Sequence, residues 1–143
     1  MSKTTITLHR IDEDFNMEAT DENGHKVWMD TAPDHGGHNN GVRPMQMLLM
    51  GLGGCTSIDV IMILKKQRQE IQDFNIHILA DREEDKEPAL WSKAHIIFSL
   101  KGNIDEDKAA RAAELSMHKY CSVAETLRRA GAEITWEVKI NKE

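Results

Sequence analysis

Apolar and polar residues alternate at the start of the chain with a period of two, which is typical of half-buried β-strands. Ile6 and Leu8 alternate with polar neighbours, and two further alternating runs cover residues 15–19 and 27–29. Asn23-Gly24 lies between these two runs, and an Asn-Gly pair in that position is a strong hairpin signal. The pattern therefore predicts three antiparallel strands in the first part of the chain.

A long apolar segment follows a loop-like stretch at residues 31–42 that is rich in glycine and asparagine. Pro44 suits the first turn of a helix, and the segment predicts a helix that ends near Gln69. The segment is long enough to raise the question of a membrane span. Asp59 argues against one, because a carboxylate near the middle of a bilayer is costly. We expect a helix of a soluble domain, buried on nearly all sides, and no membrane partner.

The second half of the chain returns to strands and short helices. Alternating runs at 74–80 and 94–100 flank a charged turn and predict a second hairpin. Asp105 can cap a helix, Ser122 to Glu125 has the form of a capping box, and 134–140 is a last alternating run. The order βββ–α–ββ–αα–β predicts a single α+β domain over residues 1–143.

Composition and charge indicate which kinds of partner the protein can bind and in which cellular compartment it is expected. The chain has 143 residues, of which 40% are apolar, and a formal net charge of −6. The negative charge argues against a nucleic-acid partner, because phosphate binding needs a basic face. The start of the chain has no recognisable signal peptide, and two cysteines in such a sequence predict free thiols in the reducing cytoplasm.

Cys55 and Cys121 are the only cysteines and the main candidates for chemistry. Cys55 lies within the apolar helix with Asp59 one turn later, and a neighbouring carboxylate disfavours a thiolate. Cys121 precedes a helix start and follows His118 and Lys119, features that favour a thiolate. Local sequence thus predicts Cys121 to be the more acidic thiol. Both cysteines are also compatible with packing positions that have no chemical role.

Other candidate sites are weaker. His35 and His38 flank a Gly-Gly pair beside Asp34, but a metal centre needs three or four well-spaced ligands. We expect no metal and no cofactor, and neither a phosphate-binding loop nor a Ser–His–Asp order is recognisable. Three glycines lie within the apolar helix, where they predict close helix packing, room for a ligand, or both: Gly51, Gly53 and Gly54.

Two segments resemble the OsmC/Ohr family of thiol-dependent hydroperoxide reductases. They are Arg43-Pro-Met-Gln-Met-Leu-Leu-Met-Gly-Leu-Gly-Gly-Cys55 and Tyr120-Cys-Ser-Val-Ala-Glu-Thr-Leu127. The resemblance implies an OsmC-like fold, with antiparallel sheets packed around a long buried central helix in an intertwined homodimer. It also implies that Cys55 is the peroxidatic thiol for organic hydroperoxides and that Cys121 is the resolving thiol. An external dithiol would reduce the resulting disulfide.

The chain departs from the family pattern near the helix start. Better-known members carry a glutamate directly after the helix-leading proline, whereas Met45 stands in that position here. The family's loop arginine is not recognisable in residues 31–42, so the candidate supporting residues are Gln46, Arg43 and His38. The chain looks closest to a less-characterised branch. The alternative is therefore an OsmC-like dimer without significant peroxidase activity that binds a small ligand or is purely structural.

Overall fold

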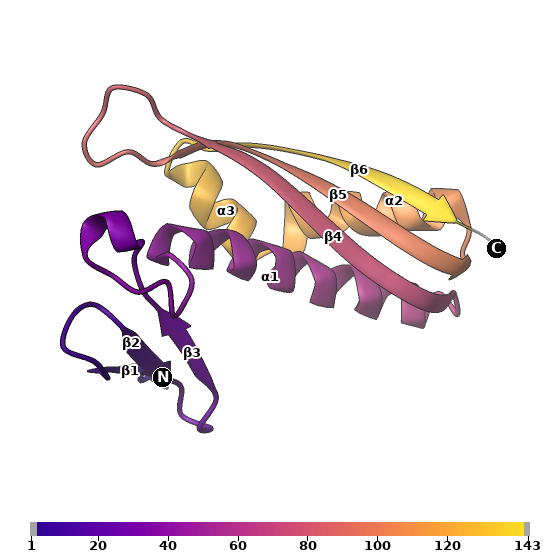
Figure 1. Ribbon diagram of the computed structural model, residues 1–143. Helices are drawn as coiled ribbons and strands as arrows, with labels where there is room; N and C mark the ends of the chain where they lie inside the picture. The colour runs from indigo at the N-terminus through magenta and orange to yellow at the C-terminus, as the bar shows by residue number, and fades with distance from the viewer. Residues whose placement is uncertain (1–2, 142–143) are drawn as a thin grey trace. The chain divides into compact units, whose positions relative to one another are not determined.

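The computed structural model describes residues 3–141, whose elements follow the predicted order (Figure 1). The chain forms two compact units that divide between Leu48 and Leu49. The first unit contains β1 (Thr7–Arg10), β2 (Met17–Thr20), β3 (Lys26–Met29), a short 3-10 turn η1 (Pro33–His35) and the start of α1 (Pro44–Lys66). The second contains the rest of α1, β4 (Glu70–Arg82), β5 (Trp91–Asn103), α2 (Glu106–Leu115), a π-helical turn η2 (Ser116–Tyr120), α3 (Ser122–Arg129) and β6 (Glu133–Asn141).

The first unit is built on the predicted three-stranded antiparallel meander. β2 is the central strand, and Ala19 lies opposite Leu8 on one side and Val27 on the other. In the β2–β3 turn, the Asp21 carboxylate accepts the backbone N–H groups of Asn23 and His25, at 2.9 and 2.8 Å. This carboxylate organises the turn locally, and the predicted hairpin is confirmed.

The second unit contains a three-stranded sheet in the order β4-β5-β6. β4 and β5 form the predicted antiparallel hairpin, whereas β5 and β6 are parallel. The expectation of purely antiparallel sheets is therefore wrong for this last pair. The physical reason is the connection: α2, η2 and α3 carry the chain back to the end of the sheet where β5 begins, as a parallel crossover requires.

The core of the second unit lies between this sheet and the helices. Ile96, Phe98 and Leu100 alternate along β5 and are buried. They belong to one apolar cluster with residues of α1 and with three buried alanines of α2: Ala109, Ala112 and Ala113. The small alanine side chains let α2 pack closely, so the core is filled mainly by the large side chains of β5 and α1.

α1 is buried along one side only within the chain, so the expectation of burial on nearly all sides is not met. Its buried residues recur every four positions, at Leu52, Thr56, Val60 and Leu64. The opposite side is apolar and exposed, because the sheet and the other helices of the second unit cover a single face of α1. α1 alone among the described helices is long and apolar enough to cross a membrane, by length and composition only. Of its most apolar window, 22% is buried inside the chain.

The three glycines of α1 have different surroundings. A Cβ on Gly53 would lie 3.3 Å from Cδ1 of Ile78 on β4, which is a close helix–sheet contact. A Cβ on Gly51 or Gly54 would meet nothing within 4 Å. Close packing within the chain therefore explains Gly53 and leaves the other two on open surface.

The strongest demand for glycine is at Gly102, where φ is 143° and a Cβ would overlap the carbonyl oxygen of Glu70. Gly131 has a φ of 107° but open space around it. We expect Gly131→Ala to lower the free energy of unfolding by about 1–2 kcal/mol, the cost of the left-handed conformation alone. Gly102→Ala adds a clash with backbone and should cost about 3 kcal/mol or more. Urea unfolding followed by circular dichroism checks the order, and equal losses would contradict it.

Candidate functional site

The fold brings the two cysteines together in the second unit. The sulfur atoms of Cys55 and Cys121 and a carboxylate oxygen of Asp59 all lie within 4.8 Å of one another. Cys55 comes from the middle of α1, and Cys121 lies between η2 and α3. Both thiols are free. Cys55 is partly exposed, whereas Cys121 is only 3% exposed.

The π-helical turn η2 determines where Cys121 lies. This turn between α2 and α3 is wider than a turn of α-helix. Its closing hydrogen bond runs from the N–H of Cys121 to the carbonyl oxygen of Ser116, at 2.8 Å. The guanidinium of Arg128 on α3 donates to the carbonyl oxygen of Met117 and ties the turn to the next helix. π-Helical turns occur frequently at functional sites, where they reorient side chains.

Cys121 itself is the N-cap of α3. Its backbone is extended, with φ −78° and ψ 102°, and its sulfur accepts the N–H of Ala124 at 3.4 Å. The predicted capping box that begins with Ser122 is therefore wrong, because the helix starts one residue earlier than that pattern requires. Glu125, the acidic member of the predicted box, pairs instead with Arg129 at 2.9 Å.

The acidity predicted for Cys121 from local sequence is also wrong. Burial raises the pKa of the Cys121 thiol from 9.0 to about 11, and the N–H of Ala124 only partly opposes this effect. Hydrogen bonding with the Cys55 side chain and the negative charges of Cys55 and Asp59 are smaller contributions to the same rise in pKa. The two side chains that were expected to favour a thiolate have other contacts. Lys119 lies over the ring of Tyr120, and the ring of His118 meets Trp136 edge-on.

A buried polar network adjoins the two sulfurs. The Ser116 hydroxyl donates to the Asp59 carboxylate at 2.8 Å and lies 2.7 Å from the Thr56 hydroxyl. Thr56 and Ser116 are completely buried. Sequence reasoning singled out Asp59 but missed Thr56 and Ser116. The available signal was a hydroxyl residue within the apolar helix and another between Leu115 and Met117.

A cavity of about 310 Å³ opens beside Asp59. Its remaining lining residues come from α1, the segment that follows it, α2 and η2: Met62, Ile63, Lys66, Gln67, Leu115 and Tyr120. The walls are mostly apolar, and Asp59 and Lys66 are the charged residues among them. The cavity is large enough for a small organic molecule next to the carboxylate.

The other predicted supporting residues, Arg43 and Gln46, make their described bonds within the first unit. The Arg43 guanidinium donates to the carbonyl oxygens of Gly41 and Asp30, at 3.2 and 3.4 Å. The Gln46 side chain accepts the N–H of Arg43 at 3.0 Å, where α1 begins. These contacts shape the entrance to α1. A role for either residue beside a thiol remains a prediction.

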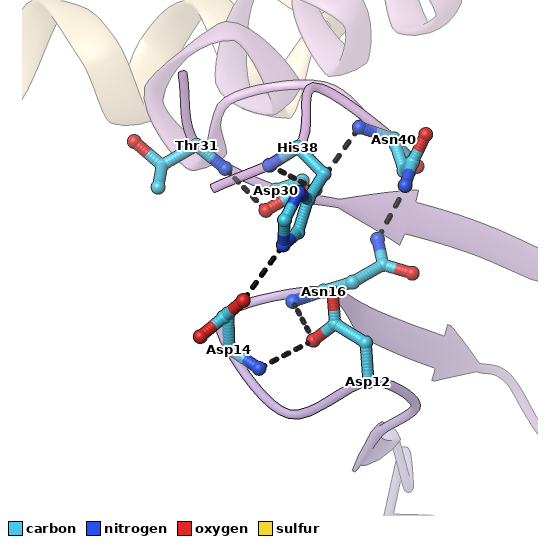
Figure 2. Close-up of polar contacts among 7 residues, drawn as sticks. All are labelled: Asp12, Asp14, Asn16, Asp30, Thr31, His38 and Asn40. Atoms are coloured by element: carbon cyan, nitrogen blue, oxygen red, sulfur yellow. Dashed lines mark hydrogen bonds and ion pairs between the residues drawn. The ribbon is translucent and has the colours of Figure 1, made fainter. Parts of the chain in front are cut away.

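His38 belongs to a polar network in the loops of the first unit (Figure 2). Its Nε2 lies 2.7 Å from the Asp14 carboxylate, a contact that raises the pKa of His38. Nearby, Asp30 accepts the backbone N–H groups of Asn40, Thr31 and His38 at 3.0, 2.8 and 3.3 Å. These bonds, that of Asn40 first, hold the pKa of Asp30 below its usual range. The network organises the loop, and any role of His38 beside a thiol remains a prediction.

Two groups of potential metal ligands occur among the described residues. Asp12, Asp14 and His38 form the first, and Cys55, Asp59 and Cys121 form the second. His38 thus groups with the aspartates of the preceding loop. In the first group the Asp14 carboxylate already pairs with His38, and Asp12 accepts two backbone N–H groups. In the second group, two thiols and a carboxylate would suit a borderline or soft cation such as Zn²⁺.

The raised pKa of Cys121 predicts an unreactive thiol near neutral pH. At pH 8, a pKa of about 11 instead of 9.0 lowers the thiolate fraction by about 100-fold. Iodoacetamide should therefore modify Cys121 slowly at pH 8 and faster as the pH approaches 11. The folded state also holds the thiol proton more tightly than the unfolded state. The resulting contribution to stability is present below pH 9 and is lost as the pH rises toward 11.

The measurement is alkylation of Cys55→Ser followed by mass spectrometry, with the same protein in guanidinium chloride as the control. A native Cys121 rate at pH 8 equal to that of the unfolded chain would contradict the assignment.

Comparison with known proteins supports the predicted resemblance. A family model described as "OsmC-like protein" matches residues 37–137, which include both cysteines. The chain is 40% identical over 111 residues to Protein YhfA of Escherichia coli K12, covering 75% of this chain and 77% of that protein.

Solved structures agree in fold. A crystal structure of a hypothetical protein from Aquifex aeolicus VF5 has a TM-score of 0.81 and 30% identity, covering 99% of this chain and all of the other, 100%. The organic hydroperoxide resistance protein OhrB of Bacillus subtilis has a TM-score of 0.63 and 16% identity, with 98% of each chain covered. That likeness concerns the fold alone. From the family model, the E. coli relative and the shared architecture together, the chain belongs to the OsmC-like protein family.

Proposed function

We propose that this protein is a thiol-dependent peroxidase that reduces organic hydroperoxides, with Cys55 as the peroxidatic thiol and Cys121 as the resolving thiol. One observation carries the proposal. Two free sulfurs from distant parts of the chain lie within 4.8 Å of each other, one partly exposed and the other buried. Small movements would allow a disulfide between them.

The chemistry has one oxidation, one condensation that releases water, and one reduction. The Cys55 thiolate attacks the peroxide oxygen, the O–O bond breaks, and the alkoxide takes a proton to leave as an alcohol. Cys55 is then a sulfenic acid. The Cys121 sulfur attacks the Cys55 sulfur, a disulfide forms, and water leaves. An external dithiol restores both thiols by exchange and supplies the two electrons that the peroxide consumed.

The burial of the two sulfurs supports this division of roles. Cys55 is partly exposed and can meet a peroxide, whereas Cys121 is only 3% exposed. The raised pKa also keeps Cys121 protonated near neutral pH, so it does not compete for the oxidant. Cys121 then becomes important only after Cys55 has been oxidised.

Related proteins support the reaction class. OhrB of B. subtilis is named as an organic hydroperoxide resistance protein and shares the fold. Its name suggests a role in defence against oxidative stress, and we carry that role over to this chain as part of the proposal. The two free thiols are consistent with a reducing cytoplasmic location.

A second candidate function is binding of a small apolar ligand without turnover. The cavity of about 310 Å³ beside Asp59 favours it, because its walls are mostly apolar. Asp59, which lines this cavity, also has a carboxylate oxygen within 4.8 Å of both sulfurs. Met45 after Pro44, in place of the family glutamate, also favours it. The peroxidase proposal and this alternative differ in whether Cys55 is consumed by a hydroperoxide.

We also propose a homodimer formed through the exposed side of α1. Met50, Gly54, Ile58 and Met62 recur every four residues, offset by two positions from the buried row, and all are exposed. The exposed fractions of Met50, Ile58 and Met62 are 52%, 63% and 51%. An apolar row with a glycine in it is a suitable surface for close packing of a second copy.

The peroxidase proposal predicts that Cys55→Ser abolishes consumption of cumene hydroperoxide in the presence of dithiothreitol. Cys121→Ser should keep the first step and accumulate Cys55 sulfenic acid, because no resolving thiol remains. Peroxide loss measured by ferrous-xylenol orange, with dimedone trapping of the sulfenic acid, separates the variants. Equal consumption by Cys55→Ser and the wild type would sink the proposal and favour the binding alternative.

The dimer proposal predicts that Ile58→Glu converts a dimer to a monomer, because two buried carboxylates would face each other across the interface. Ile58 is 63% exposed within the chain, so the fold of each protomer should persist. Leu79→Glu on β4 is the matched control, since Leu79 is 60% exposed. Size-exclusion chromatography with light scattering gives the mass. A wild-type monomer, or an Ile58→Glu dimer, contradicts the interface.

A further inference from the structure

Asp59 is a carboxylate in a mostly apolar helix, one turn after Cys55. Removing a charged group from water costs free energy unless polar partners compensate. Asp59 is partly buried and accepts a hydrogen bond from Ser116 at 2.8 Å. One of its oxygens also lies within 4.8 Å of both sulfurs. A charge held beside two thiols is unexpected in a site that needs thiolates, because it disfavours their ionisation.

The hydrogen bonds around Asp59 have a definite direction. Ser116 has a single hydroxyl proton and donates it to Asp59, so Thr56 must donate to Ser116 across their 2.7 Å contact. Both hydroxyl residues are completely buried. The Asp59 carboxylate is therefore held in position by buried protein groups. A carboxylate has about four acceptor positions, and Ser116 occupies one of them. Acceptor capacity remains for a proton from a nearby thiol.

The resolving step needs a proton acceptor and then a proton donor. Cys121 is a neutral thiol at the start of the resolving step, because its pKa is raised to about 11, mainly by burial. A thiolate is the effective nucleophile, so the Cys121 proton must leave during the attack. The hydroxyl group on the Cys55 sulfenic acid must gain a proton to leave as water. Both sulfurs are within 4.8 Å of the same carboxylate.

We infer that Asp59 is the acid–base group of the resolving step, an inference that rests on the proposed peroxidase function. The Asp59 carboxylate takes the proton from the Cys121 thiol as the S–S bond forms. It then gives that proton to the hydroxyl that leaves Cys55, so that one water is released. The disulfide forms with no net change in the charge of Asp59, and no further reactant is needed.

A purely electrostatic role for Asp59 makes the opposite prediction. The negative charge of Asp59 contributes to the raised pKa of Cys121, so removing it should ease ionisation of that thiol. If Asp59 acts only through its charge, Asp59→Asn accelerates disulfide formation. If Asp59 transfers the proton, Asp59→Asn slows it. The sign of the effect therefore distinguishes the two roles.

The test is a single-turnover reaction of reduced protein with one equivalent of cumene hydroperoxide. Aliquots are quenched with dimedone or with acid, and mass spectrometry gives sulfenic acid and disulfide separately. In Asp59→Asn we expect sulfenic acid to form within about 3-fold of the wild-type rate and disulfide to form at least about 100-fold more slowly, a usual loss for a missing acid–base group. Asp107→Asn, an exposed carboxylate on α2, is the matched control and should match the wild type.

Chemical rescue provides an independent readout. Asp59→Ala leaves a gap beside the cavity that Asp59 lines, and a small carboxylate can enter it. Formate should restore disulfide formation in this variant by at least about 10-fold, whereas chloride at equal ionic strength should not. Rescue would not accompany a merely structural role, and it keeps the inference testable if Asn at position 59 impairs folding.

The outcomes separate the inference from the function on which it rests. Disulfide formation in Asp59→Asn at the wild-type rate or faster, or no formate rescue of Asp59→Ala, overturns the role of Asp59 and leaves the peroxidase proposal intact. Absence of both sulfenic acid and disulfide in the wild-type protein overturns the peroxidase proposal, and the inference falls with it.

Discussion

The buried hydrogen bond between Thr56 and Ser116 is the constraint on which the arrangement of the site depends. It joins α1 to the π-helical turn at 2.7 Å, between two residues with no exposed surface. The Thr56 side of the bond is next to Cys55, and Ser116 accepts the N–H of Cys121 through its carbonyl oxygen. Breaking it would remove the side-chain partner of the buried Thr56 hydroxyl, which is costly in a core. The bond therefore holds the two cysteine-bearing segments in one relative position.

Burial, more than local charge, distinguishes the two sulfurs. Cys121 has a helix start, a histidine and a lysine nearby in sequence, yet its thiol is less acidic than usual. The neighbouring side chains of His118 and Lys119 have aromatic contacts, and desolvation outweighs the single N–H that Ala124 donates to the sulfur. In the proposed reaction, this difference would let two chemically identical side chains act in successive steps without competing for the same oxidant.

The sequence predicted the order of the elements well, because strand alternation and the apolar helix are local patterns. The alternation at 94–100 corresponds to the buried side of β5, and the Asn-Gly hairpin forms between β2 and β3. Other features depend on contacts between segments that no local pattern encodes. The parallel pairing of β6 follows from the path of the helices between β5 and β6. The N-cap of α3 is Cys121, directly after η2, and not the predicted Ser122.

In the candidate site, too, the sequence identified some residues, whereas the contacts between distant segments identified the others. Cys55 and Cys121 stood out as residue types, whereas Ser116 and Thr56 resemble ordinary hydroxyl residues until the fold pairs them. Arg43 was a candidate because the family pattern demands a cation. Its described hydrogen bonds, however, are to the backbone carbonyls of Gly41 and Asp30, which sequence spacing does not reveal.

One sulfur serves both as the proposed resolving thiol and as the cap of α3. A cap stabilises a helix by about 1 kcal/mol, and here that stabilisation depends on a sulfur atom that can still accept the N–H of Ala124. Interactions present only in the reduced form shift a dithiol–disulfide equilibrium toward the dithiol, and so raise the reduction potential. If the proposed disulfide forms, the helicity of the first turn of α3 and the reduction potential of the cysteine pair are therefore thermodynamically linked.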